Sequence, residues 1–198
     1  MDRFHAAFFF LIEGADGADR TVREGELDRS VLVPVPDADT AAAVAAELMA
    51  EGGLDLIELY GGLGPVAAAA VIDATGGRVP VGLVGVEGPG TQGDRAVIFA
   101  SAGADPTRDR YVFEQPGSRM TVVFVPDPSV VPAIATQLVD DGTVAIEVCG
   151  GLGPVPAAAV AQAVEDVHVG SVLFGFESIV GAASYRQRYE QSVAALAR

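Results

Sequence analysis

The sequence predicts an α/β protein made of two copies of one module, residues 1–94 and 95–198, each with a mostly parallel sheet. Residues 58–71 and 147–160 are identical at 11 of their 14 positions, and matching residues elsewhere lie 89 or 90 apart. Each copy also alternates apolar, strand-like runs with helix-like segments. Two copies are too few for a solenoid, so we expect a pair of equivalent modules related by a pseudo-twofold axis.

Four apolar runs in each copy predict strands. They cover residues 6–12, 30–35, 55–59 and 81–86 in the first copy and 96–102, 121–125, 145–148 and 172–176 in the second. The polar stretch after the first strand predicts one or two helical turns. An N-cap residue, Asp37 or Asp127, predicts the helix after the second strand. Pro65 and Pro154 suit the first turn of the next helix, and residues 181–198 predict a C-terminal amphipathic helix.

The connection between the copies bears on how the strands are arranged. Eight strands could close into one small βα barrel built from two half-barrels. The connection over residues 87–94 is eight residues long, whereas a crossover with its helix needs about a dozen or more. We therefore expect two βαβαβαβ modules with open sheets, and the closed barrel is the alternative.

The second copy carries the fuller motif. Residues 147–154 read Glu-Val-Cys-Gly-Gly-Leu-Gly-Pro between a predicted strand and helix, after Gly-Ala-Asp-Pro at 103–106 and Val-Pro-Asp at 125–127. This pattern resembles a bacterial domain family of unknown function, which is usually a single module. The resemblance covers both copies but not the C-terminal helix, and the first copy departs from it at Tyr60 and over residues 16–29. It implies the module and no activity.

Composition excludes several functions. The chain has 27 acidic and 12 basic residues, a formal charge of −15, and every basic residue is Arg. Without Lys it forms no Schiff base with pyridoxal phosphate or a carbonyl substrate and has no P-loop lysine. The charge disfavours nucleic acid and anionic membranes as partners. We expect a small-molecule ligand, and a homodimer is possible.

The single cysteine and the lengths of the apolar runs indicate where in the cell the protein is located. Cys149 has no second cysteine to pair with, which fits a reducing cytoplasm. The apolar segment near the N-terminus is repeated in mid-chain, so it predicts a strand and not a signal peptide. No apolar run reaches the ~20 residues that span a bilayer. We therefore expect a cytoplasmic protein.

Carboxylates follow the predicted strands in both copies. Because ligands of parallel α/β sheets bind at the carboxyl ends of strands, we expect a site at one edge that gathers these side chains: Asp16, Asp37, Glu58, Glu87, Asp105, Asp127, Glu147 and Glu177. Glu58 and Glu147 end apolar strands, so they are candidates for a general acid/base pair or for Mg²⁺ or Mn²⁺ ligands. Asp37 and Asp127 are explained by helix capping.

Two further features could bind an anion. The Gly-rich turns offer free backbone N–H groups at a helix start. Their glycines are Gly61, Gly62 and Gly64 in the first copy and Gly150, Gly151 and Gly153 in the second. Close strand–helix packing explains them equally. Arg108 and Arg110 could clamp an acidic ligand, or pair with surface carboxylates.

Cys149 lies two residues after Glu147, beside a helix start that could lower its pKa and make it a nucleophile. Packing of a small buried side chain is the alternative, since Tyr60 takes its place in the first copy.

Two functions remain open. One is an enzyme, of lyase, isomerase or hydrolase type, acting on a small polar or anionic molecule. Glu147 and Glu58 would be its catalytic groups and Cys149 an auxiliary one. The other is a non-catalytic binding or interaction module, a homodimer fused by duplication. The difference between Tyr60 and Cys149 points to the second copy as the place of a working site, and the sequence leaves metal dependence open.

Overall fold

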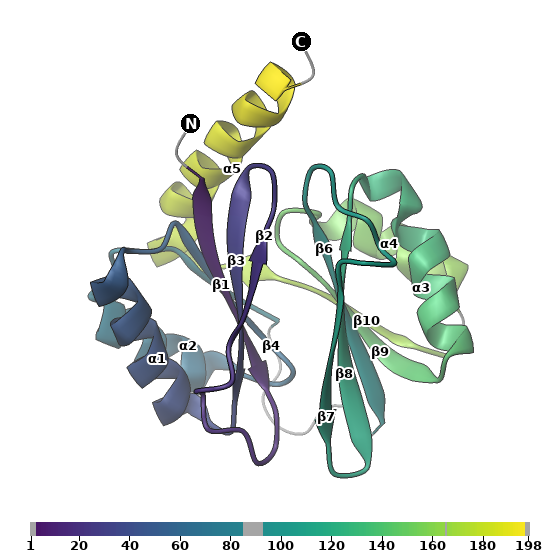
Figure 1. The fold of residues 1–198 in the computed structure, drawn as a ribbon, viewed down its shortest axis with the longest axis horizontal. Helices are drawn as coiled ribbons and strands as arrows, with labels where there is room; N and C mark the ends of the chain where they lie inside the picture. The colour runs from purple at the N-terminus through teal and green to yellow at the C-terminus, as the bar shows by residue number, and fades with distance from the viewer. Residues whose placement is uncertain (1–2, 85–92, 165, 197–198) are drawn as a thin grey trace.

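The computed structural model describes residues 3–84, 93–164 and 166–196, whose strands form two open sheets (Figure 1). The first sheet has the order β11-β5-β4-β1-β3-β2 and the second β10-β9-β6-β8-β7. The strands of the first sheet are β1 (Phe4–Leu11), β2 (Thr21–Glu24), β3 (Asp28–Val35), β4 (Leu56–Tyr60), β5 (Val81–Leu83) and β11 (Leu173–Phe174). Those of the second sheet are β6 (Asp94–Ala100), β7 (Arg110–Gln115), β8 (Ser118–Val125), β9 (Thr143–Val148) and β10 (His168–Ser171).

The two repeats have the same strand order, which confirms the predicted duplication of one fold. In the first sheet β3, β1, β4 and β5 are parallel and β2 runs antiparallel to β3. In the second sheet β8, β6, β9 and β10 are parallel and β7 runs antiparallel to β8. The prediction of mostly parallel sheets with intervening helices is therefore confirmed.

Each repeat carries its helices on one face of its sheet. In the first repeat α1 (Ala38–Glu51) joins β3 to β4 and α2 (Pro65–Thr75) joins β4 to β5. Both connections run in the same direction across the sheet, and right-handed crossovers in one direction place their helices on one face. A short 3₁₀ helix (Pro128–Val130), α3 (Val131–Asp140) and α4 (Pro154–Ala163) repeat this arrangement.

The free faces of the two sheets pack against each other, so the layers run helices, sheet, sheet, helices (Figure 1). Aromatic rings from both repeats meet there: the Phe8 and Phe99 centroids are 4.2 Å apart, and Tyr60 and Phe99 are 5.3 Å apart. A separate apolar cluster joins the first sheet to α1 and α2. Each sheet is thus covered on both faces, one of them by the other repeat.

Two local predictions were wrong. The stretch after the first strand forms an edge strand, β2 or β7, and not helical turns. Exposed and half-buried residues alternate along β7, as in a strand with one face toward solvent. The fourth strand of the second copy is β10 and not residues 172–176. Leu173 and Phe174 instead form β11, which crosses to the first sheet and pairs antiparallel with β5. Residues 85–86 of the first copy's predicted fourth strand lie outside the described residues.

The C-terminal helix α5 (Phe176–Leu196) begins five residues before its predicted start, directly after β11. It lies against the amino-terminal end of the first sheet and extends beyond it (Figure 1). The rings of Tyr185 and Tyr189 each lie 5.4 Å from that of Phe4. The Ser178 hydroxyl accepts a hydrogen bond from the N–H of Val81 at 3.0 Å. The last helix of the second repeat is therefore fastened to the first.

The expectation of one common edge of carboxylates was wrong. Ser101, just past the end of β6, bonds to Asp28, the first residue of β3, with 2.6 Å between the oxygens. The strands of the two sheets therefore run in opposite directions, as a twofold axis perpendicular to them requires. The carboxyl edge of the second sheet lies over the amino-terminal half of the first. Each end of the sandwich combines one carboxyl edge with the inner face of the other sheet.

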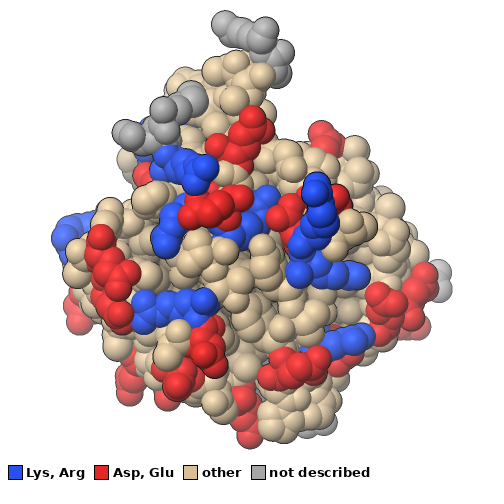
Figure 2. Space-filling model, in the orientation of Figure 1, with Lys and Arg blue, Asp and Glu red and all other residues tan. Residues whose placement is uncertain are grey.

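The surface mixes charges of both signs. On the face shown in Figure 2, arginines lie beside acidic side chains. Ion pairs join Arg3 and Arg29 to Glu24, Arg20 to Glu47, and Arg119 to Asp94. None of the helices in the described part of the chain combines the length and the apolar character needed to cross a bilayer.

Candidate functional site

The two candidate glutamates interlock the repeats. Glu58 and Glu147 are both buried, on β4 and β9, and face the interface between the sheets. Glu58 Oε1 accepts a hydrogen bond from the N–H of Gly150 at 3.1 Å, and Glu147 Oε2 accepts one from the N–H of Gly61 at 2.9 Å. Each carboxylate thus binds the glycine turn of the other repeat. The anion at these turns is the protein's own side chain.

The glycines are also required by packing. A Cβ atom on Gly150 would lie 2.6 Å from Glu58 Oε1, which no side chain could tolerate without moving the carboxylate. Gly61 has a φ of 74°, in the left-handed region that favours glycine, and its Cβ would meet the backbone nitrogen of Leu11 at 3.1 Å. Close approach and N–H donation, which the sequence left as alternatives, are both present.

The second oxygen of each glutamate has a different partner. Glu147 Oε1 accepts from Arg95 Nη2 at 2.5 Å, and Arg95 Nη1 donates to the Gly61 carbonyl at 2.8 Å. Glu58 Oε2 instead accepts from the Tyr60 hydroxyl. Burial raises the pKa of Glu58 to about 7, and the Tyr60 and Gly150 hydrogen bonds oppose the rise. Burial also raises the pKa of Glu147, which Arg95 opposes.

A cavity of about 640 Å³ lies at one end of the sandwich, between the inner face of the first sheet, the carboxyl edge of the second and α5. Its walls are mostly apolar and include Phe8, Leu56, Phe99, Phe124, Phe174, Tyr185 and Tyr189. The polar and charged lining comes from Asp28, Ser30, Glu58, Ser101, Asp127, Cys149, Arg186 and Glu190, with the backbone of Gly150 and Gly151. The cavity therefore brings Glu58 and Cys149 together, and Glu147 does not line it.

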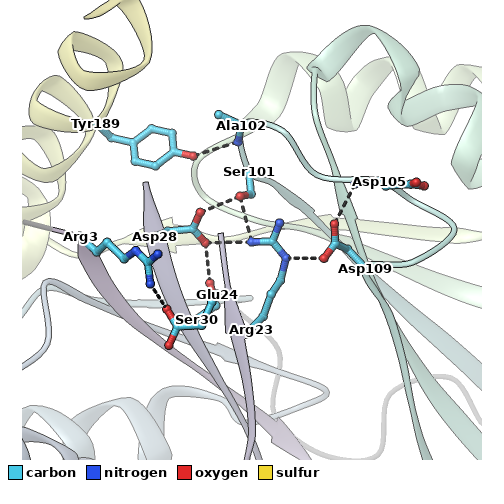
Figure 3. A network of polar contacts seen from close by, with 10 residues as sticks. All are labelled: Arg3, Arg23, Glu24, Asp28, Ser30, Ser101, Ala102, Asp105, Asp109 and Tyr189. Carbon is cyan, nitrogen blue, oxygen red and sulfur yellow. Dashed lines mark hydrogen bonds and ion pairs between the residues drawn. The ribbon is translucent and has the colours of Figure 1, made fainter. Parts of the chain in front are cut away.

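A buried polar network forms part of the cavity wall (Figure 3). Arg23, 4% exposed, donates to Asp28 at 3.2 Å, to Ser101 at 3.0 Å and to Asp109 at 3.0 Å. The hydroxyls of Ser101 and Ser30 also donate to Asp28. This network joins β2 and β3 to the second repeat. Sequence reasoning missed it because Arg23 and Asp28 lie in the segment that was interpreted as helical turns.

The remaining candidates are engaged elsewhere. Arg108 is exposed and pairs with Asp105 at 2.9 Å, and neither Arg108 nor Arg110 lines the cavity. Surface pairing thus accounts for Arg108. Gly64 and Gly153 are the N-cap residues of α2 and α4, and Gly62 has a positive φ within its turn.

The capping aspartates behave as expected. Asp37 accepts from the N–H of Thr40 at 2.8 Å and Asp127 from that of Ser129 at 2.7 Å. Asp127 also lines the cavity. Within the described residues, no three His, Cys, Asp or Glu side chains gather closely enough to hold a metal ion. Glu87 lies outside the described residues.

Cys149 should be unreactive. Burial, with Glu58 nearby, raises the pKa of its thiol to about 12, opposite to the lowering expected from the helix start. Since the thiolate is the nucleophile, iodoacetamide at neutral pH should modify native Cys149 at least about a hundredfold more slowly than the unfolded chain. Mass spectrometry of native and urea-unfolded protein measures this, and equal rates would restore Cys149 as a nucleophile.

These features define a class: an α/β sandwich of two repeats with a cavity between them at one end. Residues 4–95 and 93–187 each match the Family of unknown function (DUF6506), so the chain belongs to this family and contains two copies of its domain. No curated protein sequence matches it significantly. A solved structure described as the ABC domain in complex with L-Trp from Streptococcus pneumonia is 12% identical, with 96% of this chain and 84% of that chain covered and a TM-score of 0.32.

Proposed function

We propose that this protein binds a small molecule in the cavity between its repeats, and that Glu58 contacts the ligand's polar group. The observation that carries the proposal is the cavity itself. Its volume of about 640 Å³ falls within the ~300–1,000 Å³ of small-molecule sites. Mostly apolar walls with a few polar groups are also typical of such sites. The ligand we expect has an apolar body and one polar group.

The opposite end of the sandwich supports this by contrast. Sheet register pairs Ala6 with Ser30 in the first repeat and Arg95 with Met120 in the second, so Arg95 and Met120 are the counterparts of Ala6 and Ser30. Tyr60 is likewise the counterpart of Cys149. Larger side chains thus take the places of Ala6, Ser30 and Cys149, and Tyr60 and Met120 are fully buried. The smaller Ser30 and Cys149 line the cavity, which fits the retention of one working site after duplication.

Helix α5 adds a wall that no described segment of the first repeat matches. It contributes Tyr185 and Tyr189 to the lining, together with the small side chains of Ala182 and Ala183. Tyr189 is held in place because its hydroxyl accepts a hydrogen bond from the N–H of Ala102 at 3.2 Å. A ligand below this helix would be largely screened from water.

Proton-transfer catalysis is the second candidate, and Glu58 favours it. A general acid or base works best with a pKa near the working pH, and the pKa of Glu58 is raised to about 7. Glu58 also lines the cavity, where a substrate would lie. Lyase, isomerase and hydrolase reactions all include such a step. Glu147, paired with Arg95 and outside the cavity, is the weaker candidate.

Filling the cavity should abolish binding. Ala182→Phe places a ring in the cavity from α5, whereas Ala195→Phe adds the same ring on the same helix outside the lining. We expect metabolites from a small-molecule library that raise the melting temperature of the wild type to have no effect on Ala182→Phe. They should still stabilise Ala195→Phe. Thermal-shift measurements on the three proteins test this.

Two results would contradict the proposal that the ligand binds in the cavity. Ligands that stabilise Ala182→Phe as much as the wild type would bind elsewhere. A library without a single stabilising compound would favour the non-catalytic interaction module instead.

A further inference from the structure

Glu147 and the glycine turn at Gly61 together bind a cation, the guanidinium of Arg95. This guanidinium lies between two acceptors, Glu147 Oε1 at 2.5 Å and the Gly61 carbonyl at 2.8 Å. The same turn donates its N–H to the other carboxylate oxygen. A cation with two N–H donors therefore completes this arrangement, and here it comes from the chain itself.

At the cavity end the same arrangement lacks its cation. Glu58 and Gly150 repeat the carboxylate and the turn, with the N–H of Gly150 bonded to Glu58. Ala6 takes the place of Arg95, and no described residue forms an ion pair with Glu58. Within the described chain the Gly150 carbonyl also accepts no hydrogen bond, whereas its counterpart, the Gly61 carbonyl, accepts from Arg95. The Gly150 carbonyl is thus left for an incoming group. Glu58 Oε2 already accepts from the Tyr60 hydroxyl, so an incoming N–H group would bind the second lone pair of that oxygen.

The other cavity charges are already paired. Asp28 pairs with Arg23 at 3.2 Å, and Glu190 pairs with Arg186 at 2.8 Å. Asp127 caps a helical turn, so Glu58 is the buried carboxylate without a counter-charge. A buried carboxylate without a cation is costly, and it either takes up a proton or binds a positive group.

Aromatic rings favour a positive group in the same place. Phe8, Phe99 and Phe124 line the cavity, and cations are attracted to the faces of such rings. The guanidinium of Arg23 already lies 4.3 Å from the centroid of Phe124. The walls therefore suit an apolar or aromatic body that carries a cationic head.

We propose that the ligand of this cavity is a cation with an apolar body, an amidinium, guanidinium or protonated amine whose N–H groups bind Glu58 and the Gly150 carbonyl. This inference rests on the proposed function and names its ligand class. The cation would stand where Arg95 stands at the other end of the molecule. Of the polar or anionic ligand expected from the sequence, it keeps the polar character and replaces the anionic alternative with a cation.

Three probes of nearly equal shape test the charge. Benzamidine is a cation, benzamide is neutral and benzoate is an anion. Isothermal titration of the full chain at about pH 8, where Glu58 is mostly ionised, should show benzamidine binding at least about tenfold more tightly than benzamide. Benzoate should bind most weakly. This comparison uses the wild type alone, so it does not depend on a variant that folds.

Two matched variants then assign the contact. Glu58→Gln should lower benzamidine affinity at least about tenfold and leave benzamide binding nearly unchanged. Glu47→Gln removes an equal charge outside the lining, on α1, where Arg20 already pairs with Glu47 at 2.7 Å, and should change neither. Ala182→Phe should remove binding of both.

Each contrary result has a distinct meaning. Benzamide binding as tightly as benzamidine would overturn the cation preference and leave the small-molecule site intact. Absence of benzamidine binding would overturn it too, while the library screen on Ala182→Phe decides the cavity's function separately. Equal loss in Glu58→Gln and Glu47→Gln would show a general charge effect and not the proposed contact.

Discussion

Separated repeats should not fold alone. Residues 3–93 and 94–196, produced as two chains, should each lack fixed tertiary structure as monomers, because one face of each sheet is covered only by the other repeat. In the first repeat that face includes Phe8, Phe10, Leu32 and Tyr60, all buried. Leaving a large apolar side chain exposed forfeits about 1.5–3 kcal/mol. Four of them approach the whole ~5–15 kcal/mol stability of a typical domain.

Mixing the two chains should restore the structure. Near-ultraviolet circular dichroism of the tyrosines and gel filtration report on assembly, and the intact chain is the control. The first chain additionally loses β11 and α5, which cover the end of its sheet. A repeat that stays a folded monomer with dispersed amide signals would contradict this expectation. A homodimer of one repeat would agree with it, since the same face would again be covered.

Local sequence patterns predicted the elements that depend on neighbours in the chain. The helices α2 and α4 begin at Pro65 and Pro154 because a residue without an N–H fits the first turn. Asp37 caps α1 through the N–H of Thr40. Apolar runs placed the parallel strands, since a sheet covered on both faces selects continuous apolar sequence.

Contacts between distant residues could not be predicted in this way. Gly61 and Glu147 are 86 residues apart, and Gly150 and Glu58 are 92 apart. No local pattern shows that a carboxylate of one repeat will bind the turn of the other. The repeated Glu did indicate a partner, because a buried carboxylate requires one. Which residue becomes that partner depends on how the two sheets pack, with their strands running in opposite directions.

The cavity was beyond prediction for the same reason. Its lining combines the first sheet, the edge of the second and α5, and the sequence assigned α5 no place. The Tyr60 and Cys149 difference was interpreted as the sign of a working site in the second copy, with the thiol as an auxiliary group. The structure shows a difference in volume: the larger side chain is fully buried, and Cys149 lines the cavity.

Arg95→Met should lower the free energy of unfolding by about 3–5 kcal/mol, since removing one partner of a buried ion pair leaves the other charge uncompensated. Glu147 would remain buried with only the N–H of Gly61 to stabilise its charge. Arg186→Met removes an exposed arginine paired with Glu190 at 2.8 Å. That matched control should cost less than about 1 kcal/mol. Urea unfolding of both variants at neutral pH measures the difference.

Two experiments separate the effect of the Arg95 charge on stability from the effect of its packing. The double variant Arg95→Met/Glu147→Gln should regain part of the lost stability, because Gln still accepts from Gly61 and carries no charge. Acid should also reduce the loss in Arg95→Met. Burial already raises the pKa of Glu147, and without Arg95 it rises further, so the penalty is absent where Glu147 is protonated and appears as the pH rises through that pKa. If the double variant is no more stable than Arg95→Met, and the loss is the same at every pH, then the arginine stabilises the interface by packing and Glu147 does not need its charge.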